Sequence, residues 1–432
     1  MSRTELVLTA EELRMLSGEY GEGIAMAMRI VVGLGRIVGA QRMVEITSAH
    51  VDSCLYHGQV SLDFAGRLVE LGASVRVPTT LNVGSMDLLH PGLIRTNTKA
   101  EREVAAGGRR LMSAYLALGC AATWTCAPYQ LPARPGLGDH IAWAESNAIV
   151  FANSVLGART DRYGDFVDIC AAITGRVPFS GLQTEEARRG TVVFDCSDLE
   201  RALLGSELVY PLLGQYVGSV AGSEIPVLVG IPADVSEDRL KALGAAAASS
   251  GGVAMFHAVG VTPEAATLED ALKGREPLSV HGVSPEDLRA TRAELSTFSS
   301  GRIDAVSVGT PHASYAECVV LADLLRDGPP IRDDVRFYLS TARATLALAE
   351  KTGVLPILES AGVTVVVDTC TYVTAILSPA AKRVMTNSAK WAYYAPANIG
   401  AEVVLGSVEE CVASARLGRV VLDDALFGEA SR

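Results

Sequence analysis

The second half of the chain alternates short apolar runs with amphipathic helical stretches. Five apolar runs, each able to form a buried strand, lie at residues 224–232, 253–261, 303–311, 363–370 and 401–407. Helical patterns separate them, most clearly at residues 236–249 and 315–327. Apolar strands that alternate with helices are typical of parallel sheets covered by helices on both faces. The pattern therefore predicts a layered α/β fold built on mostly parallel sheets.

The length of the chain predicts more than one lobe. A chain of 432 residues is too long for one ordinary core and favours two or three lobes. We expect a lobe with most of the polar motifs at 1–220, an α/β lobe and connection at 221–300, and a further α/β lobe at 301–432. A helix should begin after Ser284, because a serine N-cap followed by Pro285 and two acidic residues is a helix start signal.

Charge and composition exclude several classes of protein. The 37 basic residues stand against 49 acidic ones, a formal net charge of -12, whereas nucleic-acid binding normally requires a basic surface. No apolar run is long enough to span a bilayer, and the first residues lack the pattern of a secretory signal. Eight dispersed cysteines indicate reduced thiols. We therefore expect a cytoplasmic protein without nucleic-acid or membrane partners.

Polar residues in the first half are denser than packing requires. Residues 48–58 read SAHVDSCLYHG, with two histidines, an aspartate, a tyrosine, two serines and a cysteine in eleven positions. A buried helix expected at 140–160 would place several further polar side chains among apolar ones, and buried polar groups need partners. Similar densities occur at residues 78–87, 125–162, 368–372 and 386–396.

Two cysteines stand in contexts that suit metal ligation. Cys370 ends an apolar run and should emerge at the carboxyl end of a strand, where open α/β sheets place their ligands. Cys126 precedes a helix-breaking Ala-Pro step. Taken singly, each is more often an ordinary buried thiol. The other cysteines in helical or apolar contexts are expected to be structural: Cys120, Cys170, Cys196, Cys318 and Cys411.

Several motifs together resemble the catalytic large part of the aconitase X family, a branch of the aconitase superfamily of dehydratases. The resemblance runs over nearly the whole chain and implies an aconitase-like multidomain fold. It also implies an iron-sulfur cluster or a mononuclear iron held by cysteines from separate segments, and elimination of water from a small hydroxy acid. The motifs are TCAPY at 125–129, GDHIAWAESNAIVFANSVLGART at 138–160, AAITGRVPFSGL at 171–182, VDTCTY at 367–372 and TNSAKWAYYAP at 386–396, supported by GEGIAMAMRI at 21–30 and PTTLN at 78–82.

The resemblance implies Cys54, Cys126 and Cys370 as the metal ligands. A cluster that binds substrate through iron usually keeps three protein thiolates. In archaeal members that dehydrate phosphomevalonate, a Gly-Cys-Pro-His segment is expected where this chain reads GTPH at 309–312. Because Thr310 cannot replace a thiolate, Cys54 is expected to supply the third one.

The resemblance also implies roles for polar side chains. His50 is the preferred acid–base or orienting group, with His140 and His312 behind it. Glu145 should orient a ligand or catalytic group. Lys390 and Arg159 are the cations expected to neutralise a substrate carboxylate, although both could form buried ion pairs. The other expected substrate contacts are Ser48, Thr79, Thr80, Asn82, Ser146, Asn147, Asn153, His312, Asn387 and Ser388.

Some of these residues have structural alternatives. Thr79, Thr80 and Asn82 fit equally a turn that closes a strand. Asn387 and Ser388 fit a helix cap, because a helical pattern follows them.

The cysteine pattern also bears on the substrate. Bacterial members of this kind resemble enzymes that convert cis-3-hydroxy-L-proline to a pyrroline-2-carboxylate. Such a reaction needs a base for a weakly acidic proton and a Lewis acid for a poor leaving group. Dehydration of phosphomevalonate is the alternative, although no obvious glycine-rich phosphate loop is present. A cluster-bearing regulatory protein and a cofactor-free α/β enzyme are the other classes to test.

A partner chain is expected as well. Enzymes of the superfamily need a small swivelling domain that closes the site and contributes a catalytic serine. The recognisable motifs finish near Gly418, so this domain is expected to be absent from the chain and to be supplied by a separate small subunit.

Overall fold

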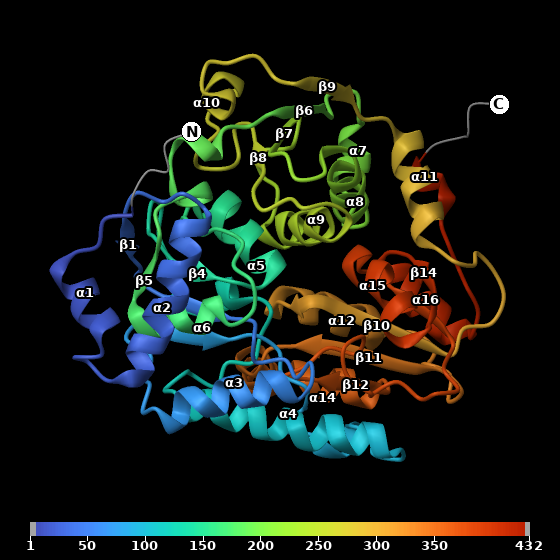
Figure 1. Ribbon diagram of the computed structural model, residues 1–432. Coiled ribbons are helices and arrows are strands. Elements are labelled where there is room, and N and C mark those ends of the chain that lie inside the picture. The colour runs from blue at the N-terminus through green and yellow to red at the C-terminus, as the bar shows by residue number, and fades with distance from the viewer. Residues whose placement is uncertain (1–5, 428–432) are drawn as a thin grey trace. The chain divides into compact units, whose positions relative to one another are not determined.

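The computed structural model describes residues 6–427 (Figure 1). The chain divides into two compact units, the first comprising residues 1–86 and 94–189 and the second comprising residues 87–93 and 190–432. Nearly all strand pairs in both units are parallel, so the predicted α/β class with mostly parallel sheets is confirmed. The three expected lobes remain a prediction, and residues 1–5 and 428–432 at their outer ends lie outside the described part.

The first unit holds two small sheets and six α-helices in its described residues. The parallel sheet has the strand order β3-β2-β4, and β1 pairs with β5 antiparallel. The strands are β1 Met43–Glu45, β2 Ala49–Val51, β3 Thr79–Leu81, β4 Ala142–Trp143 and β5 Arg176–Pro178. The helices are α1 Ala10–Ser17, α2 Glu22–Ile37, α3 Gln59–Glu70, α4 Lys99–Ala117, α5 Ser146–Phe151 and α6 Val167–Thr174, with a π-helical turn at Ala152–Leu156.

The register of the parallel sheet determines where the polar motifs meet. His50 lies opposite Thr80 of β3 and Trp143 of β4. All three residues of β2 are buried, so this strand carries His50 into the interior. Because parallel strands end at the same edge of a sheet, the residues that follow β2, β3 and β4 gather there.

The helix expected across residues 140–160 is shorter than predicted. Residues 142–143 instead form β4, which pairs with β2, and α5 begins only at Ser146. Glu145 begins this helix as its N-cap, because its side chain accepts a hydrogen bond from the Ala148 backbone N–H at 2.9 Å. The helix that follows is buried, as predicted.

The second unit contains two parallel sheets, with strand orders β8-β7-β6-β9 and β12-β11-β10-β13-β14. All five apolar runs predicted as strands contain one: β7 Pro226–Val229, β8 His257–Ala258, β10 Ala305–Ala313, β12 Val363–Val366 and β14 Glu402–Leu405. The remaining strands are β6 Val192–Asp195, β9 Ser279–Gly282, β11 Arg336–Thr341 and β13 Arg383–Thr386.

Along the chain, most helices of the second unit connect one strand of these sheets to the next, and α16 follows the last strand (Figure 1). The predicted start after Ser284 is confirmed, since Ser284 and Asp287 form a capping box and Pro285 is the first helical residue. The helices are α7 Arg201–Leu204, α8 Val209–Ala221, α9 Glu237–Ser250, α10 Leu268–Leu272, α11 Pro285–Leu295, α12 Tyr315–Arg326, α13 Arg343–Thr352, α14 Val354–Ser360, α15 Ala389–Ile399 and α16 Val408–Leu417.

A short segment from the first half of the chain, residues 87–93, belongs to the second unit. Asp87 accepts a hydrogen bond from the Val367 backbone N–H at 3.0 Å. Asp368 accepts one from the Leu88 backbone N–H at 3.0 Å and pairs with Arg343. These reciprocal contacts fix the loop after β12 that leads to Cys370.

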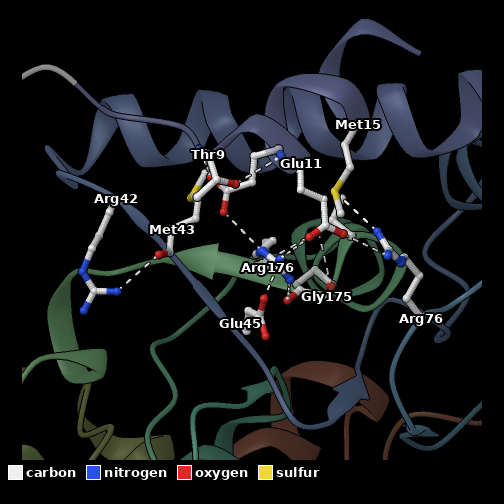
Figure 2. Close-up of polar contacts among 12 residues, drawn as sticks. Thr9, Glu11, Met15, Arg42, Met43, Glu45, Arg76, Gly175 and Arg176 are labelled. Atoms are coloured by element: carbon white, nitrogen blue, oxygen red, sulfur yellow. Dashed lines mark hydrogen bonds and ion pairs between the residues drawn. The ribbon is translucent and has the colours of Figure 1, made fainter. Parts of the chain in front are cut away.

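Arg176 connects α1 to the antiparallel pair β1–β5 (Figure 2). Its guanidinium lies 3.2 Å from Glu12, 2.8 Å from Glu45 and 3.3 Å from Glu11, and its side chain is only 10% exposed. Arg76 also reaches Glu11, at 3.2 Å. Because Glu12 is itself buried, its charge depends on Arg176 for compensation.

Removing Arg176 should therefore destabilise the first unit. We expect Arg176→Met to lower the free energy of unfolding by about 3 kcal/mol, because buried Glu12 loses its cation. Arg14→Met is the control: Arg14 is 52% exposed and pairs with exposed Glu19, so the change should stay within about 1 kcal/mol. Urea denaturation measures both. Equal losses in the two variants would contradict a special role for Arg176.

Candidate functional site

His50 is a buried, neutral histidine. Its side chain has no solvent exposure, and burial lowers its pKa to about 3. Nδ1 lies 2.8 Å from the Thr80 hydroxyl, while Nε2 has no hydrogen-bond partner among the described residues. A neutral imidazole with one nitrogen held and the other open can form a hydrogen bond with a bound molecule, but a pKa this low makes it a weak base.

Two carboxylates, each bonded to an amide side chain, lie at the carboxyl edge of the same sheet. Asn82 donates a hydrogen bond to Asp52, and Asn147 donates one to Glu145. Burial, and next the negative charge of Glu145, raise the pKa of Asp52 to about 7. A carboxyl group that titrates near neutral pH is suited to acid–base work. Asp52 was missed among the sequence candidates, although its place directly after a buried strand was a usable signal.

Asp168 fixes the turn that follows β2. Its carboxylate accepts hydrogen bonds from the backbone N–H groups of Asp52 at 2.7 Å and Ser53 at 2.9 Å, and from the Ser53 hydroxyl at 2.8 Å. Burial raises the pKa of Asp168 to about 6, although the bonds from Ser53 favour its charged form. The one sequence signal for this role was a single acid within the apolar helix VDICAAIT.

Cys54 is a buried thiol surrounded by oxygen atoms. Its Sγ lies 3.5 Å from the Val51 carbonyl oxygen, 3.3 Å from that of Asn82 and 3.8 Å from that of Val83. Burial, followed by the charges of Asp52 and Asp168, raises the pKa of Cys54 well above its usual value. This environment favours the protonated thiol, so a thiolate here would need a nearby cation. The assignment of Cys54 as a ligand stays a prediction.

Cys126 lies in a loop that the Glu145 region holds in place. Its backbone carbonyl accepts a hydrogen bond from Asn147 Nδ2 at 3.0 Å, and the Tyr129 hydroxyl donates to Asn147 Oδ1 at 2.6 Å. Asn147 also donates to Glu145. Asn147 therefore links Glu145 to the Cys126 loop, and the expected orienting role of Glu145 would act through this link.

The second unit brings His312 and Cys370 together. Both side chains are buried, and their ligand atoms lie within 4.8 Å of each other. His312 Nε2 lies 3.1 Å from the Thr369 carbonyl oxygen, a contact that orients the imidazole ring. An imidazole and a thiol are fitting donors for iron, so this pair could hold a metal ion. His312, expected as a substrate contact and as an alternative acid–base group, is therefore also a candidate ligand.

Three expected substrate contacts meet at the start of α15. Asn387, Ser388 and Lys390 line one cavity of the second unit, together with Lys241 and Thr310. Ser388 is also the N-cap of α15, since its hydroxyl accepts a hydrogen bond from the Trp391 backbone N–H at 3.1 Å. The helix-cap alternative is thus confirmed for Ser388 and is compatible with a place at the cavity.

Other expected site residues make structural contacts. Arg159 pairs with Glu185, His140 Nδ1 lies 2.7 Å from Gln183, and Asn153 contacts the buried Arg188. Their assignment to substrate or catalysis stays a prediction. The same holds for Thr79, whose hydroxyl donates to the Val77 carbonyl, for Ser146, whose hydroxyl donates to Glu145, and for half-buried Ser48.

Three family profiles cover most of the chain. The aconitase X first domain matches residues 5–186, the second domain residues 190–294 and the third domain residues 303–416. This chain belongs to the aconitase X family. The resemblance drawn from its motifs is therefore confirmed.

Relatives of the chain are dehydratases. It is 41% identical to cis-3-hydroxy-L-proline dehydratase of Pseudomonas aeruginosa over 95% of this chain and 70% of that protein. The same enzyme of Hypocrea jecorina is also 41% identical, over 94% of this chain and 68% of that protein. The phosphomevalonate dehydratase large subunit of Thermococcus kodakarensis is 35% identical over 95% of this chain and 100% of that protein. The expected hydro-lyase class is confirmed at the level of the family.

A solved structure supports the fold. The crystal structure of Thermococcus kodakaraensis aconitase X in its holo-form matches with a TM-score of 0.83 and 34% sequence identity, covering 95% of this chain and 100% of that chain. The predicted aconitase-like fold is thereby confirmed. Among the described residues, no helix has the length and apolar character needed to cross a membrane.

The buried state of His50 predicts a pH dependence of stability. In the unfolded chain His50 takes up a proton near its ordinary pKa of 6.5, whereas in the folded chain it stays neutral down to about 3. Its contribution to stability is therefore present above the unfolded pKa and is lost as the pH falls. Relative to His50→Asn, the wild-type free energy of unfolding should rise by about 2–3 kcal/mol between about pH 4.5 and 6.5.

Chemical denaturation across this pH range measures the effect. His57→Asn is the matched control, because His57 is exposed in the same segment and its loss should leave the pH profile as in the wild type. A His50→Asn profile parallel to that of the wild type would show that folding does not lower the pKa of His50.

Proposed function

We propose that this chain is the large subunit of an iron-dependent dehydratase that converts cis-3-hydroxy-L-proline to pyrroline-2-carboxylate in the cytoplasm. The observation that carries the proposal is the 41% identity to two enzymes of that name, against 35% to a phosphomevalonate dehydratase large subunit. The cytoplasmic location is supported by eight buried cysteines dispersed along the chain.

The metal centre is proposed to use Cys126 and Cys370, with Cys54 as the third ligand from the sequence pattern and His312 as its alternative. His312 is supported by its position beside Cys370. When bound, the iron would act as a Lewis acid on the hydroxyl group that leaves. Three such ligands suit either an iron-sulfur cluster or a single iron.

The protein groups are proposed to bind the substrate and move its proton. His50 is the proposed base, because its buried Nε2 has no hydrogen-bond partner among the described residues and the negative charge of a bound substrate would raise its pKa. Asp52 and Glu145 each hold a polar neighbour in place. Asp52 can also take up or release a proton near neutral pH. Lys390 is the proposed cation for the substrate carboxylate, because it lines one cavity with Asn387 and Ser388. Arg159, which pairs with Glu185, is the second candidate.

A small partner subunit belongs to the proposal. Relatives that match along nearly their whole length are named large subunits, which implies a second, smaller chain. We infer that this partner provides the swivelling domain and its catalytic serine. Dehydration of phosphomevalonate is the second candidate function, favoured by the same large-subunit relatives, which are 34–38% identical.

Substrate choice tests the proposal directly. The full chain, co-purified without oxygen with its small subunit, should form pyrroline-2-carboxylate from cis-3-hydroxy-L-proline. The trans isomer should react at least about tenfold more slowly, because its hydroxyl lies on the other face of the ring. Product formation is followed by chromatography. Turnover of phosphomevalonate without any turnover of the hydroxyproline would overturn the assignment.

Iron content tests the ligand set. Cys126→Ser and Cys370→Ser should each lose most of the iron of the anaerobically purified chain, because serine is a poor replacement for a thiolate. Cys411→Ser, in the buried helix α16, is the control and should keep its iron. Cys54→Ser is expected to lose iron too. If Cys54→Ser keeps its iron and His312→Ala loses it, the third ligand is His312 and not Cys54.

A further inference from the structure

Asp368, two residues before Cys370, has an unusual backbone conformation. Its φ is 62°, in the left-handed region, and its side chain is fully buried. Glycine adopts this region freely, asparagine and aspartate adopt it occasionally, and other residues are strained there. A strained conformation persists only where the surroundings fix it, and such residues gather at functional sites. The conformation of Asp368 therefore indicates a role at the loop that carries Cys370.

The carboxylate of Asp368 has donors on both oxygen atoms. Arg343 donates from Nη2 to one oxygen at 2.6 Å and from Nε to the other. The Leu88 backbone N–H donates to the same oxygen as Nη2, at 3.0 Å. Because these donors come from the start of α13 and from residues 87–93, the side chain is held from two separate segments. Rotation of the Asp368 backbone would break these contacts.

Asp87 holds the residue directly before Asp368. Its Oδ2 accepts a hydrogen bond from the Val367 backbone N–H at 3.0 Å and lies 3.1 Å from Nδ1 of His90. Its Oδ1 accepts hydrogen bonds from the backbone N–H groups of Leu89 at 3.0 Å and His90 at 2.7 Å. Asp87 is fully buried, so these contacts replace water at its carboxylate. The chain is thus fixed at two consecutive residues, Val367 and Asp368.

The residues that follow Asp368 belong to the candidate metal site. The Thr369 carbonyl oxygen lies 3.1 Å from His312 Nε2. The Cys370 carbonyl oxygen accepts hydrogen bonds from two backbone N–H groups of the turn that follows, both at 3.2 Å. A different φ at Asp368 would rotate the next peptide group. It would therefore move the Thr369 carbonyl and the Cys370 thiol relative to His312.

We propose that Asp368 is a positioning residue for the metal centre. Its left-handed backbone, held by Arg343 and by residues 87–93, places the Cys370 thiol beside His312. The inference rests on the proposed metal centre, in which Cys370 is a ligand. Neither Asp368 nor Asp87 is a proposed ligand, so both act through the backbone. Replacing groups that orient a metal ligand commonly changes metal affinity by about 10–100-fold.

Cobalt(II) is the probe, because a bond between cobalt and a thiolate gives a charge-transfer absorption band. The metal-free full chain is titrated with cobalt(II) without oxygen, and Cys370→Ser identifies the part of the absorption that comes from this thiolate. Asp368→Gly and Asp368→Ala both lose the contacts with Arg343, but only glycine adopts a positive φ without strain. We expect Asp368→Ala to bind cobalt(II) about tenfold or more weakly than Asp368→Gly.

Two further variants complete the test. Asp87→Asn leaves Asp368 and Arg343 unchanged, but removes the negative charge that accepts the Val367 N–H, so it should weaken binding by about tenfold. Asp323→Asn is the matched control, because Asp323 is 62% exposed on α12, and it should bind cobalt(II) as the wild type does. Circular dichroism establishes that each variant is folded during the titration, because a loss of stability alone leaves the affinity of the folded chain unchanged.

The outcomes separate this inference from the proposed function. Equal affinity in Asp368→Gly and Asp368→Ala would overturn the positioning role. If Asp368→Ala does not fold, Asp87→Asn decides, and wild-type affinity in that variant would overturn the role. Cobalt binding that is absent from the wild type would overturn the metal centre and this inference with it. If the expected order of affinities is found while the hydroxyproline is not dehydrated, the positioning role stands and only the substrate assignment fails.

Discussion

The candidate site of the first unit depends on one buried carboxylate, that of Asp168. It accepts two backbone N–H groups and one hydroxyl from the turn after β2, and so fixes where Asp52 and Cys54 point. An ionised carboxylate without solvent needs several hydrogen-bond donors, and this turn supplies them. Without this interaction, the parallel strands would still gather their ends, but the backbone N–H groups of Asp52 and Ser53 would lose their acceptor.

Burial disfavours the charged forms of the titratable groups around this turn. Burial lowers the pKa of His50 to about 3 and raises that of Asp52 to about 7, so both changes disfavour charge. Burial likewise raises the pKa of Cys54. A cation that enters such a site would favour the charged forms of Asp52 and Cys54, which burial disfavours.

Local patterns in the sequence predicted the fold more completely than the site. Buried parallel strands such as β10 and β12 follow from uninterrupted apolar runs, and the start of α11 follows from Ser284 and Pro285, because these signals are local. Glu145 was recognised through a motif, but its role as a helix cap required β4 to pair with β2. The Lys241–Glu317 contact joins residues 76 positions apart, and no local pattern encodes it.

Residues 87–93 give the chain an interleaved connectivity. The polypeptide leaves the first unit after Met86, returns to it at Ile94 and leaves again after Arg189, so the units are joined at three points. Neither unit corresponds to one continuous stretch of polypeptide. During synthesis, Asp87 and Leu88 must wait for partners about 280 residues further on, so this segment can be completed only late. A gene fragment that stops at the end of the first family domain would release a chain whose middle has no partner.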